Sequence, residues 1–548
     1  MWLAGLVLVL GFLGWALFRN ITLPWVEDDN WYGAVYSQAA HVNLEAGMLR
    51  TAGVPVTLYF GPLPAPAKEF YVHHPTLLPT LVTVSFAVFG ESEWAARLVP
   101  VVGSLASVVL LWLLVRSAVN ARAATLAAAF FATLPMELHY GDMVDFEPCL
   151  LMCMLAVLVC VRRWQVTGRR AWAVLAGVAT MATLWMDWPG YLFVLSLAGC
   201  FILRGWKGDG GAATDVVITK PQSLRFGLVL FGLVGISGVI FLLQIRHVRP
   251  DAWHDLWEAA TRRLSSTTAN DPAELAGQAA HFTFREWCVA ILRGLNADFL
   301  RLPWLFVALG MAVVWKGRRS DAGLRWCGFA IVPMLLAGVL YVVILRNESF
   351  VHDFATFYLI GAFAIAAGVG LDALLAHLTP RRGSAALHTV IALASLAFFT
   401  CLGVNGISRA ESLRSPFSIL DWEHPEPPDF IPSLGRYLGK VFPPGTTILC
   451  NFVTNESVDY YAQRDVVNGL MTASDWASAI GKRRPPLGGI IWLGAEGGGE
   501  IAASLPPGET RAFAFQGYRL HALAGEAGVG RISAGPRSLA EWSRCRVS

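Results

Sequence analysis

Residues 94–115 read WAARLVPVVGSLASVVLLWLLV, an apolar run that contains one charged side chain, Arg97. A helix needs about 20 apolar residues to cross the hydrocarbon core of a bilayer, and this run is long enough. Similar runs recur along the first 404 residues, at 2–18, 122–138, 147–161, 171–186, 189–204, 226–245, 303–315, 326–345, 353–375 and 386–404. The sequence therefore predicts a polytopic α-helical membrane protein with about eleven transmembrane helices.

The composition of the whole chain supports the same class of protein. Of its 548 residues, 55% are hydrophobic and 15% are charged, and the mean hydropathy is +0.52. Soluble domains contain about 25% charged residues, so these values exclude a soluble enzyme, a disordered chain and a collagen-like fibre. The net charge of +3 gives no basic surface for nucleic acid, and we expect no nucleic-acid partner.

The positions of lysine and arginine predict how the helices cross the membrane, because cytoplasmic loops are enriched in these residues. The loops that follow 94–115, 147–161 and 189–204 are basic. The short loops at 139–146 and 187–188 contain neither lysine nor arginine. We therefore expect a cytoplasmic N-terminus and an extracytoplasmic C-terminal segment.

This topology predicts two domains, a transmembrane domain at 1–404 and an extracytoplasmic α/β domain at 405–548. The transmembrane domain has two long outer loops, at 20–93 and 246–302. In the first loop, the apolar spacing of Asp29–Arg50 predicts an amphipathic helix on the membrane surface. The C-terminal domain has strand-like runs at Thr446–Phe452, Gly489–Leu493 and Arg511–Phe515, and helical stretches near 431–441 and 471–482.

Ionisable residues near the ends of the predicted helices fall on the outer side of the membrane. They are Glu27, Asp28, Asp29, His73, His74, His139, Asp142, Asp145, Glu147, Asp187, Arg346, His352 and Asp353. Ionisable groups at the ends of membrane helices are costly and tend to be functional. Any one of them could be a solvated helix end, but several clusters on one face favour an active site.

The acidic run Glu27-Asp28-Asp29 follows the first predicted helix. Adjacent carboxylates repel one another, which raises the pKa of one of them and suits it to act as a general base. The same run could instead cap the following helix, where negative charge opposes the helix dipole. Both interpretations remain open on the residues alone.

Basic and histidine side chains offer ligands for a phosphate. His73-His74 could donate to a phosphate oxygen, bind a metal or move a proton, although a histidine pair on a loop is often plain surface. Arg346 and His352, at the outer ends of two late helices, could hold a lipid-linked phosphate at the depth of the headgroups.

Three further carboxylates lie in short outer loops. Asp142 and Asp145 could bind a divalent cation or position an acceptor. Asp187, in the hairpin Trp185–Gly190, could be a third acidic site or could cap the next helix.

Five segments match, in order, the motifs of one enzyme superfamily. Residues 28–34, DDNWYGA, are similar to an Asp-Glu-x-x-Tyr-Ala motif, and 70–75, FYVHHP, to a Tyr-Phe-x-Lys-Pro-Pro motif. Residues 89–98, FGESEWAARL, resemble a Gly-x-Ser-x-x-Ala-x-Arg motif. Residues 143–145 and 351–354 resemble an outer-loop aspartate and an Arg-His-x-Tyr segment. The chain thus resembles GT-C glycosyltransferases of the family 39 type, which include bacterial relatives of protein O-mannosyltransferases and of the lipid A aminoarabinose transferase.

The resemblance implies an inverting glycosyltransferase in the bacterial inner membrane. Such an enzyme moves a sugar from a polyprenyl-phosphate donor to a lipid, protein or glycan acceptor on the extracytoplasmic face, with membrane lipids around it. The expected catalytic residues are Asp28, Asp29 and Asp145, with Asp28 as the base. The expected phosphate ligands are His73, His74, Arg346 and His352. Expected acceptor or supporting residues are Glu27, Tyr71, Asp142 and Asp187.

The chain departs from the family motifs at several positions, and these departures leave two other functions open. His73 and His74 stand where the family has lysine and the first proline, and Asp29 replaces a glutamate. A transporter or flippase of a lipid-linked intermediate is the main alternative, but transporters place charges near the midplane and have repeated halves. An inactive scaffold is a third interpretation. The motifs specify neither the sugar nor the acceptor, and they leave a divalent metal open as a cofactor.

Overall fold

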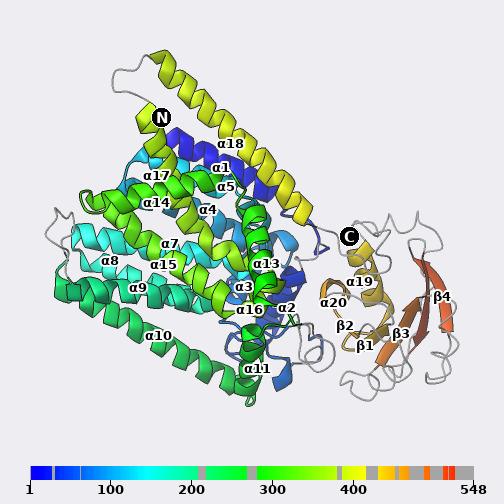
Figure 1. Ribbon diagram of the computed structural model, residues 1–548. Coiled ribbons are helices and arrows are strands. Elements are labelled where there is room, and N and C mark those ends of the chain that lie inside the picture. Colours follow the sequence, from blue (N-terminus) through cyan, green and yellow to red (C-terminus); the bar gives the residue numbers. More distant parts are fainter. Residues whose placement is uncertain are drawn as a thin grey trace. The chain divides into compact units, whose positions relative to one another are not determined.

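Helices account for most of the chain that the computed structural model describes (Figure 1). The description leaves out residues 1, 27–30, 58, 62, 208–217, 268–280, 379–384, 415–429, 451–455, 468–486, 494–509, 516–517 and 525–548. Contacts divide the chain into two compact units. Unit 1 comprises Met1–Thr22, Val72–Ser85 and Trp94–Leu413, and unit 2 comprises Leu23–Tyr71, Phe86–Glu93 and Arg414–Ser548.

Unit 1 is built from long apolar helices and the short helices that connect them. They are α1 (Trp2–Phe18), α3 (Leu77–Phe89, whose last residues belong to unit 2), α4 (Glu93–Ala118, whose first residue belongs to unit 2), α5 (Ala121–Thr133), α6 (Pro135–Tyr140), α7 (Phe146–Thr167), α8 (Arg170–Met186), α9 (Trp188–Lys207), α10 (Lys220–Val248), α11 (Ala252–Leu264), α13 (Phe284–Asp298), α14 (Pro303–Gly317), α15 (Ala322–Ile344), α16 (Arg346–Val351), η3 (Asp353–Leu359), α17 (Ile360–Leu378) and α18 (Ala385–Leu413).

The structure confirms a helical membrane protein but not the predicted count of helices. Among the described residues, seven helices are long and apolar enough to cross a membrane, or eight if α13 and α14, bent by 97°, form one span. Helices α1, α3, α5 and α8 are apolar but shorter. The run at 122–138 is broken between α5 and α6, because Leu134 precedes a proline and is extended (φ −72°, ψ 137°).

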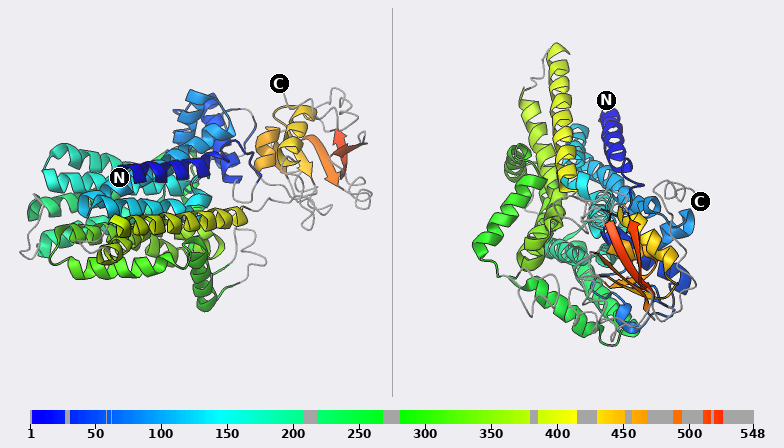
Figure 2. Two further views of the ribbon diagram at one scale, coloured as in Figure 1. Left: turned by 90° about the horizontal axis from the view of Figure 1, so that it is seen from above. Right: turned by 90° about the vertical axis from the view of Figure 1, so that its right-hand side faces the viewer.

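Small residues allow the helices of unit 1 to pack closely. Helices α9 and α10 lie side by side (Figures 1 and 2), as do α14 and α17. A Cβ atom at Gly310 of α14 would lie 1.8 Å from the carbonyl oxygen of Ala366, and one at Gly370 of α17 would lie 2.0 Å from that of Phe306. Without a hydrophobic driving force between helices in lipid, such close backbone contact is a main source of packing energy.

Unit 2 joins the first outer loop to the C-terminal part of the chain. Its elements are α2 (Trp31–Ala46), η2 (Ala67–Glu69), α19 (Phe430–Val441), β1 (Thr447–Cys450), α20 (Glu456–Ala462), β2 (Asp465–Val467), β3 (Leu487–Leu493), β4 (Thr510–Phe515) and β5 (Tyr518–Ala524). The strand order is β2-β1-β3-β5-β4. Strand β1 is parallel to β2 and β3, whereas β5 is antiparallel to β3 and β4.

The apolar core of unit 2 explains why segments far apart in sequence belong to the same unit. Val26, from the first outer loop, belongs to one buried apolar cluster with residues of α19, β1, α20 and β2. The sequence predicted the strands β1, β3 and β4 and the helix α19, but not this grouping. The helical stretch near 471–482 lies outside the described residues. Helix α2 occurs where a surface helix was predicted, but ten of its 16 residues are buried, so it packs against protein.

Candidate active site

Asp187 lies in a tight turn between two membrane helices of unit 1. It ends α8 in an extended conformation (φ −163°, ψ 169°), and Trp188 begins α9 directly after it. The turn requires Gly190, because a Cβ atom there would stand 2.3 Å from the carbonyl oxygen of Thr183. Asp187 is only 3% exposed, and a carboxylate buried this deeply must be held by polar partners.

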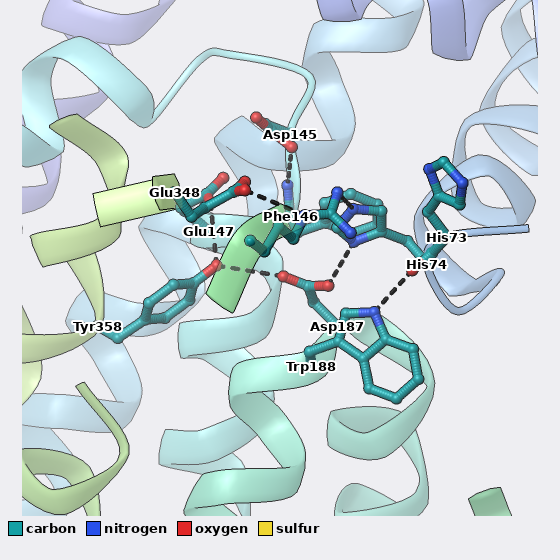
Figure 3. Close-up of polar contacts among 10 residues, drawn as sticks. His73, His74, Asp145, Phe146, Glu147, Asp187, Trp188, Glu348 and Tyr358 are labelled. Atoms are coloured by element: carbon teal, nitrogen blue, oxygen red, sulfur yellow. Dashed lines mark hydrogen bonds and ion pairs between the residues drawn. The ribbon is translucent and has the colours of Figure 1, made fainter. Parts of the chain in front are cut away.

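Histidine and tyrosine side chains surround this carboxylate (Figure 3). His74 Nδ1 lies 2.7 Å from Asp187 Oδ1. The Tyr358 hydroxyl lies 2.9 Å from Glu147 Oε1 and 3.4 Å from Asp187 Oδ2, so its single proton is donated to the nearer oxygen. These four residues come from the segment before α3, the turn before α9, the first turn of α7 and η3.

An arginine from α11 contacts the other side of the same histidine. Arg263 Nη2 lies 3.1 Å from His74 Nε2, and its Nε donates to Glu348 Oε2 of α16 at 3.0 Å. A guanidinium can only donate, so Nε2 is the acceptor and the ring proton is on Nδ1, which donates to Asp187. We call His74, Glu147, Asp187, Arg263, Glu348 and Tyr358 the His74 cluster.

The charges of the cluster keep Glu348 ionised in a buried position. Burial opposes ionisation of this carboxylate, but chiefly the positive charge of Arg263 lowers its pKa below the usual value. The Arg263 and Glu348 side chains are 14% and 11% exposed. An ion pair this enclosed is screened little by solvent, so the loss of either partner leaves a costly buried charge.

His73, the neighbour of His74, lies beside the carboxylate of Asp255 on α11. Its Nε2 is 3.2 Å from Asp255 Oδ2, and Arg249 Nη1 donates to that oxygen at 2.6 Å. Burial lowers the pKa of His73 in spite of the nearby Asp255 carboxylate, so its ring is neutral at pH 7. The His73 ring in turn lowers the pKa of Asp255. The carbonyl oxygen of His73 accepts from Trp188 Nε1 at 2.7 Å, which fixes the segment to α9 (Figure 3).

The other predicted residues of unit 1 lie around this cluster in different roles. Asp145 is buried and caps α7, where its carboxylate accepts from the Phe146 backbone N–H at 2.8 Å (Figure 3). Asp142 is buried in the same turn. The His352 ring stacks on Phe354 with centroids 4.9 Å apart. Arg346, the first residue of α16, is exposed.

Four other predicted residues of the first outer loop are the acidic run and Tyr71. Glu27, Asp28 and Asp29 lie outside the described residues. Tyr71 belongs to unit 2, where its backbone N–H donates to the Pro55 carbonyl oxygen at 2.8 Å.

Sequence reasoning missed three members of the cluster. Arg263 follows Arg262 in the second outer loop, where several arginines were noted but none could be singled out. Glu348 and Tyr358 flank the predicted His352 and carry no motif. Helical spacing in α11 was the one usable signal, because Arg263 lies two turns after Asp255 on a helix with alternating apolar and charged faces.

The described residues do not form a metal site. No group of three or more His, Cys, Asp or Glu side chains within the described ranges is arranged to hold a metal ion. The carboxylates and the single imidazole of the His74 cluster contact one another, Arg263 or Tyr358 instead.

Comparisons with known proteins agree with the predicted resemblance. Residues 73–207 match the dolichyl-phosphate-mannose-protein mannosyltransferase family. These residues include His73, His74 and Asp187. A curated relative, the undecaprenyl phosphate-alpha-4-amino-4-deoxy-L-arabinose arabinosyl transferase 2 of Proteus mirabilis (strain HI4320), is 25% identical over 270 residues. The match spans 47% of this chain and 43% of that relative.

Two solved structures are similar over most of the chain. ArnT from Cupriavidus metallidurans, bound to undecaprenyl phosphate, is 14% identical with a TM-score of 0.61, covering 95% of this chain and 97% of that one. The oligosaccharyltransferase AglB from Archaeoglobus fulgidus, in complex with an inhibitory peptide and a dolichol-phosphate, is 12% identical with a TM-score of 0.55 and covers 90% and 69%. The chain has the fold of these membrane proteins. It is an integral membrane protein, and the resemblance to GT-C glycosyltransferases is confirmed.

Proposed function

We propose that this protein is an inverting glycosyltransferase that takes a sugar from a polyprenyl-phosphate donor. The observation that carries this proposal is the buried chain Glu348–Arg263–His74–Asp187, which gathers at helix ends and lies partly inside the segment that matches mannosyltransferases. A cation held in this way is suited to an anionic group at the membrane boundary. Charges at helix ends also favour an enzyme over a transporter.

In the proposed reaction, Asp28 acts as the general base with Asp29 beside it. Asp28 takes the proton of an acceptor hydroxyl as that oxygen bonds to the anomeric carbon of the sugar. The bond between this carbon and the phosphate oxygen breaks on the opposite side, which inverts the configuration. The electron pair stays on the leaving polyprenyl phosphate, which gains one negative charge.

Arg263 is the group of the His74 cluster that we assign to this developing charge. Its guanidinium is held from two sides, by Glu348 and by His74, and a donor fixed before the reaction stabilises the transition state without reorganisation. Asp187 orients His74, which stands at the first proline of the family motif. His73 donates to the phosphate as a neutral ring, and His352 acts through Glu348. The exposed Arg346 is assigned to phosphates at headgroup depth.

The orientation and the roles of the remaining residues are proposed from the sequence. The distribution of lysine and arginine supports a cytoplasmic N-terminus and an extracytoplasmic C-terminal segment in a bacterial inner membrane. Glu27, Tyr71 and Asp142 are assigned to support of the site, as expected from the sequence. Asp145 was expected to be catalytic, but we assign it to support instead, because its carboxylate caps α7.

The decisive experiment compares wild type with Asp28→Asn in detergent, with a radiolabelled polyprenyl-phosphate sugar and a mixture of cell-envelope acceptors. We expect wild type to release or transfer the sugar and Asp28→Asn to be at least about 100-fold slower, since that is the usual contribution of a general base. Glu45→Gln is the matched control, because Glu45 is an exposed carboxylate of α2.

Two results would contradict the proposal. Equal rates for wild type and Asp28→Asn would remove this carboxylate from the mechanism. If wild type binds the donor but neither transfers nor hydrolyses the sugar, while reconstituted vesicles move the lipid across the bilayer, the protein is a transporter.

A further inference from the structure

Unit 2 contains two neighbouring tyrosines on α20, Tyr460 and Tyr461, that contact the first outer loop. The Tyr461 hydroxyl accepts from the Trp25 backbone N–H at 2.9 Å and donates to Glu93 Oε1 at 2.8 Å. The Tyr460 hydroxyl donates to Glu91 Oε1 at 3.4 Å. Both tyrosines are about 370 positions from the carboxylates in sequence, so these contacts join two ends of the chain.

The two hydroxyl groups of the tyrosine pair, Tyr460 and Tyr461, act as hydrogen-bond donors in these contacts. Burial, followed by the nearby carboxylates, raises the pKa of both hydroxyls well above the usual value for tyrosine. Both hydroxyls therefore stay protonated and donate to Glu91 and Glu93. The second oxygen of Glu91 lies 2.8 Å from His41 Nδ1 of α2, which links the same carboxylate to the loop helix.

Residues before the acidic run are fixed by the C-terminal elements. Trp25 is fully buried, and its backbone N–H is bound by Tyr461. Val26 belongs to the apolar cluster that includes Phe430 of α19 and Val458 of α20. Two consecutive residues that directly precede Glu27 are therefore held by segments more than 400 positions away in sequence.

Residues after the acidic run are fixed to the same elements. Helix α2 begins at Trp31 and packs against α20. Gly33 lies so close to the Trp25 ring that a Cβ atom there would be 2.3 Å from it. Further along α2, Gln463 Nε2 lies 3.5 Å from Gln38 Oε1. Both flanks of residues 27–30 thus rest on the C-terminal part of the chain.

We propose that Tyr460 and Tyr461 are positioning residues for sugar transfer, through which the C-terminal elements hold the two described flanks of the acidic run, Trp25 and the start of α2. This role rests on the proposed function, in which Asp28 is the base. It gives the C-terminal segment a part in catalysis that needs no contact of its own with donor or acceptor.

The first test does not depend on activity. In the full-length protein in detergent, amide hydrogen exchange is followed in peptides that cover Trp25 and the start of α2. Tyr461→Phe removes the acceptor of the Trp25 N–H, so we expect exchange there to become roughly tenfold faster, the equivalent of one net hydrogen bond. Tyr437→Phe, in the apolar cluster of the same unit, is the matched control and should leave this exchange unchanged. Unchanged exchange in Tyr461→Phe would overturn the proposal.

The second test separates positioning from general loss of structure. We expect Tyr461→Phe to lower kcat about tenfold with an unchanged KM for the donor, and Tyr460→Phe to have a smaller effect because its contact is longer. In an Asp28→Asn background, Tyr461→Phe should cause no further loss, since it acts through Asp28. An equal tenfold loss in that background would overturn the role. If wild type transfers no sugar, the proposed function fails, and the exchange measurement still decides whether Tyr461 holds the loop.

Discussion

The His74 cluster of unit 1 and the tyrosine pair of unit 2 solve a similar problem with different chemistry. Each connects side chains far apart in sequence: His74 and Asp187 are 113 positions apart, and Tyr461 and Glu93 are 368 apart. The His74 cluster uses a guanidinium, an imidazole and carboxylates. The tyrosine pair uses neutral hydroxyls that donate to carboxylates.

This difference in chemistry indicates that the tyrosine pair tolerates substitution better than the His74 cluster does. Removing one member of a buried charged pair leaves the partner without compensation, which costs several kcal/mol. Removing a neutral hydroxyl costs about 1 kcal/mol. A charged cluster is thus expensive to maintain as a mere structural link, and it is suited to a place where an anion must be bound. The tyrosine pair has the strength that suits a scaffold.

The largest expected effect is that of Arg263→Gln, which tests whether the His74 cluster binds an anion. The substitution removes the charge assigned to the leaving phosphate, so we expect transfer to slow at least about 100-fold. It also leaves Glu348 buried without its cation, which should lower the free energy of unfolding by about 3 kcal/mol. Steady-state rates and denaturant titration measure the two effects. Arg262→Gln, on the neighbouring residue of α11, is the matched control.

The double variant Arg263→Gln/Glu348→Gln separates the two consequences. Removing both charges should restore much of the stability, because no charge is left unpaired, while the rate should stay low. Recovery of the rate together with the stability would show that Arg263 only holds the fold.

The sequence predicted the membrane helices because their signal is local. A long apolar run is stable mainly as a helix within the bilayer. Each of the eleven runs overlaps a helix in the structure. Helix α3, with 13 residues, was missed because the sequence analysis placed this segment in the first outer loop. The boundary between α5 and α6 depends on Leu134 before Pro135, a signal that the apolar composition masks.

The sequence predicted some of the residues that belong to the candidate site, but not which of them contact one another. His74 and Asp187 stood out because ionisable groups at membrane ends are rare. Their contact depends on how the segment before α3 packs against the turn before α9, and nothing local encodes that. Arg263 and Arg262 are chemically identical in sequence, and only the fold selects the one that faces His74. The grouping of Val26 with α19 is likewise a property of packing.

A smaller effect is expected from Asp187→Asn, which tests whether the orientation of the His74 imidazole matters for the reaction. The amide keeps the size of the side chain but loses the charge that orients the Nδ1–H tautomer of His74. We expect kcat to fall roughly tenfold to a hundredfold, the value of a hydrogen bond to a charged group. Asp251→Asn is the control, because its carboxylate is 68% exposed. A rate equal to wild type would place Asp187 outside the mechanism and leave it a cap of the turn.

The smallest expected effect is the contribution of His73, in unit 1, to the pH dependence of stability. Burial lowers the pKa of His73 below its ordinary value of 6.5, with Arg263 and His74 acting in the same direction and Asp255 opposing them. The folded protein therefore binds fewer protons than the unfolded chain below pH 6.5, so stability from this group is complete above that pH and decreases as the pH falls. The tyrosine pair titrates far above this range and adds no slope. We expect Tm to fall between pH 7 and pH 5.5 more steeply in wild type than in His73→Gln, while Tyr461→Phe keeps the wild-type slope. Equal slopes for wild type and His73→Gln would assign the dependence to another group.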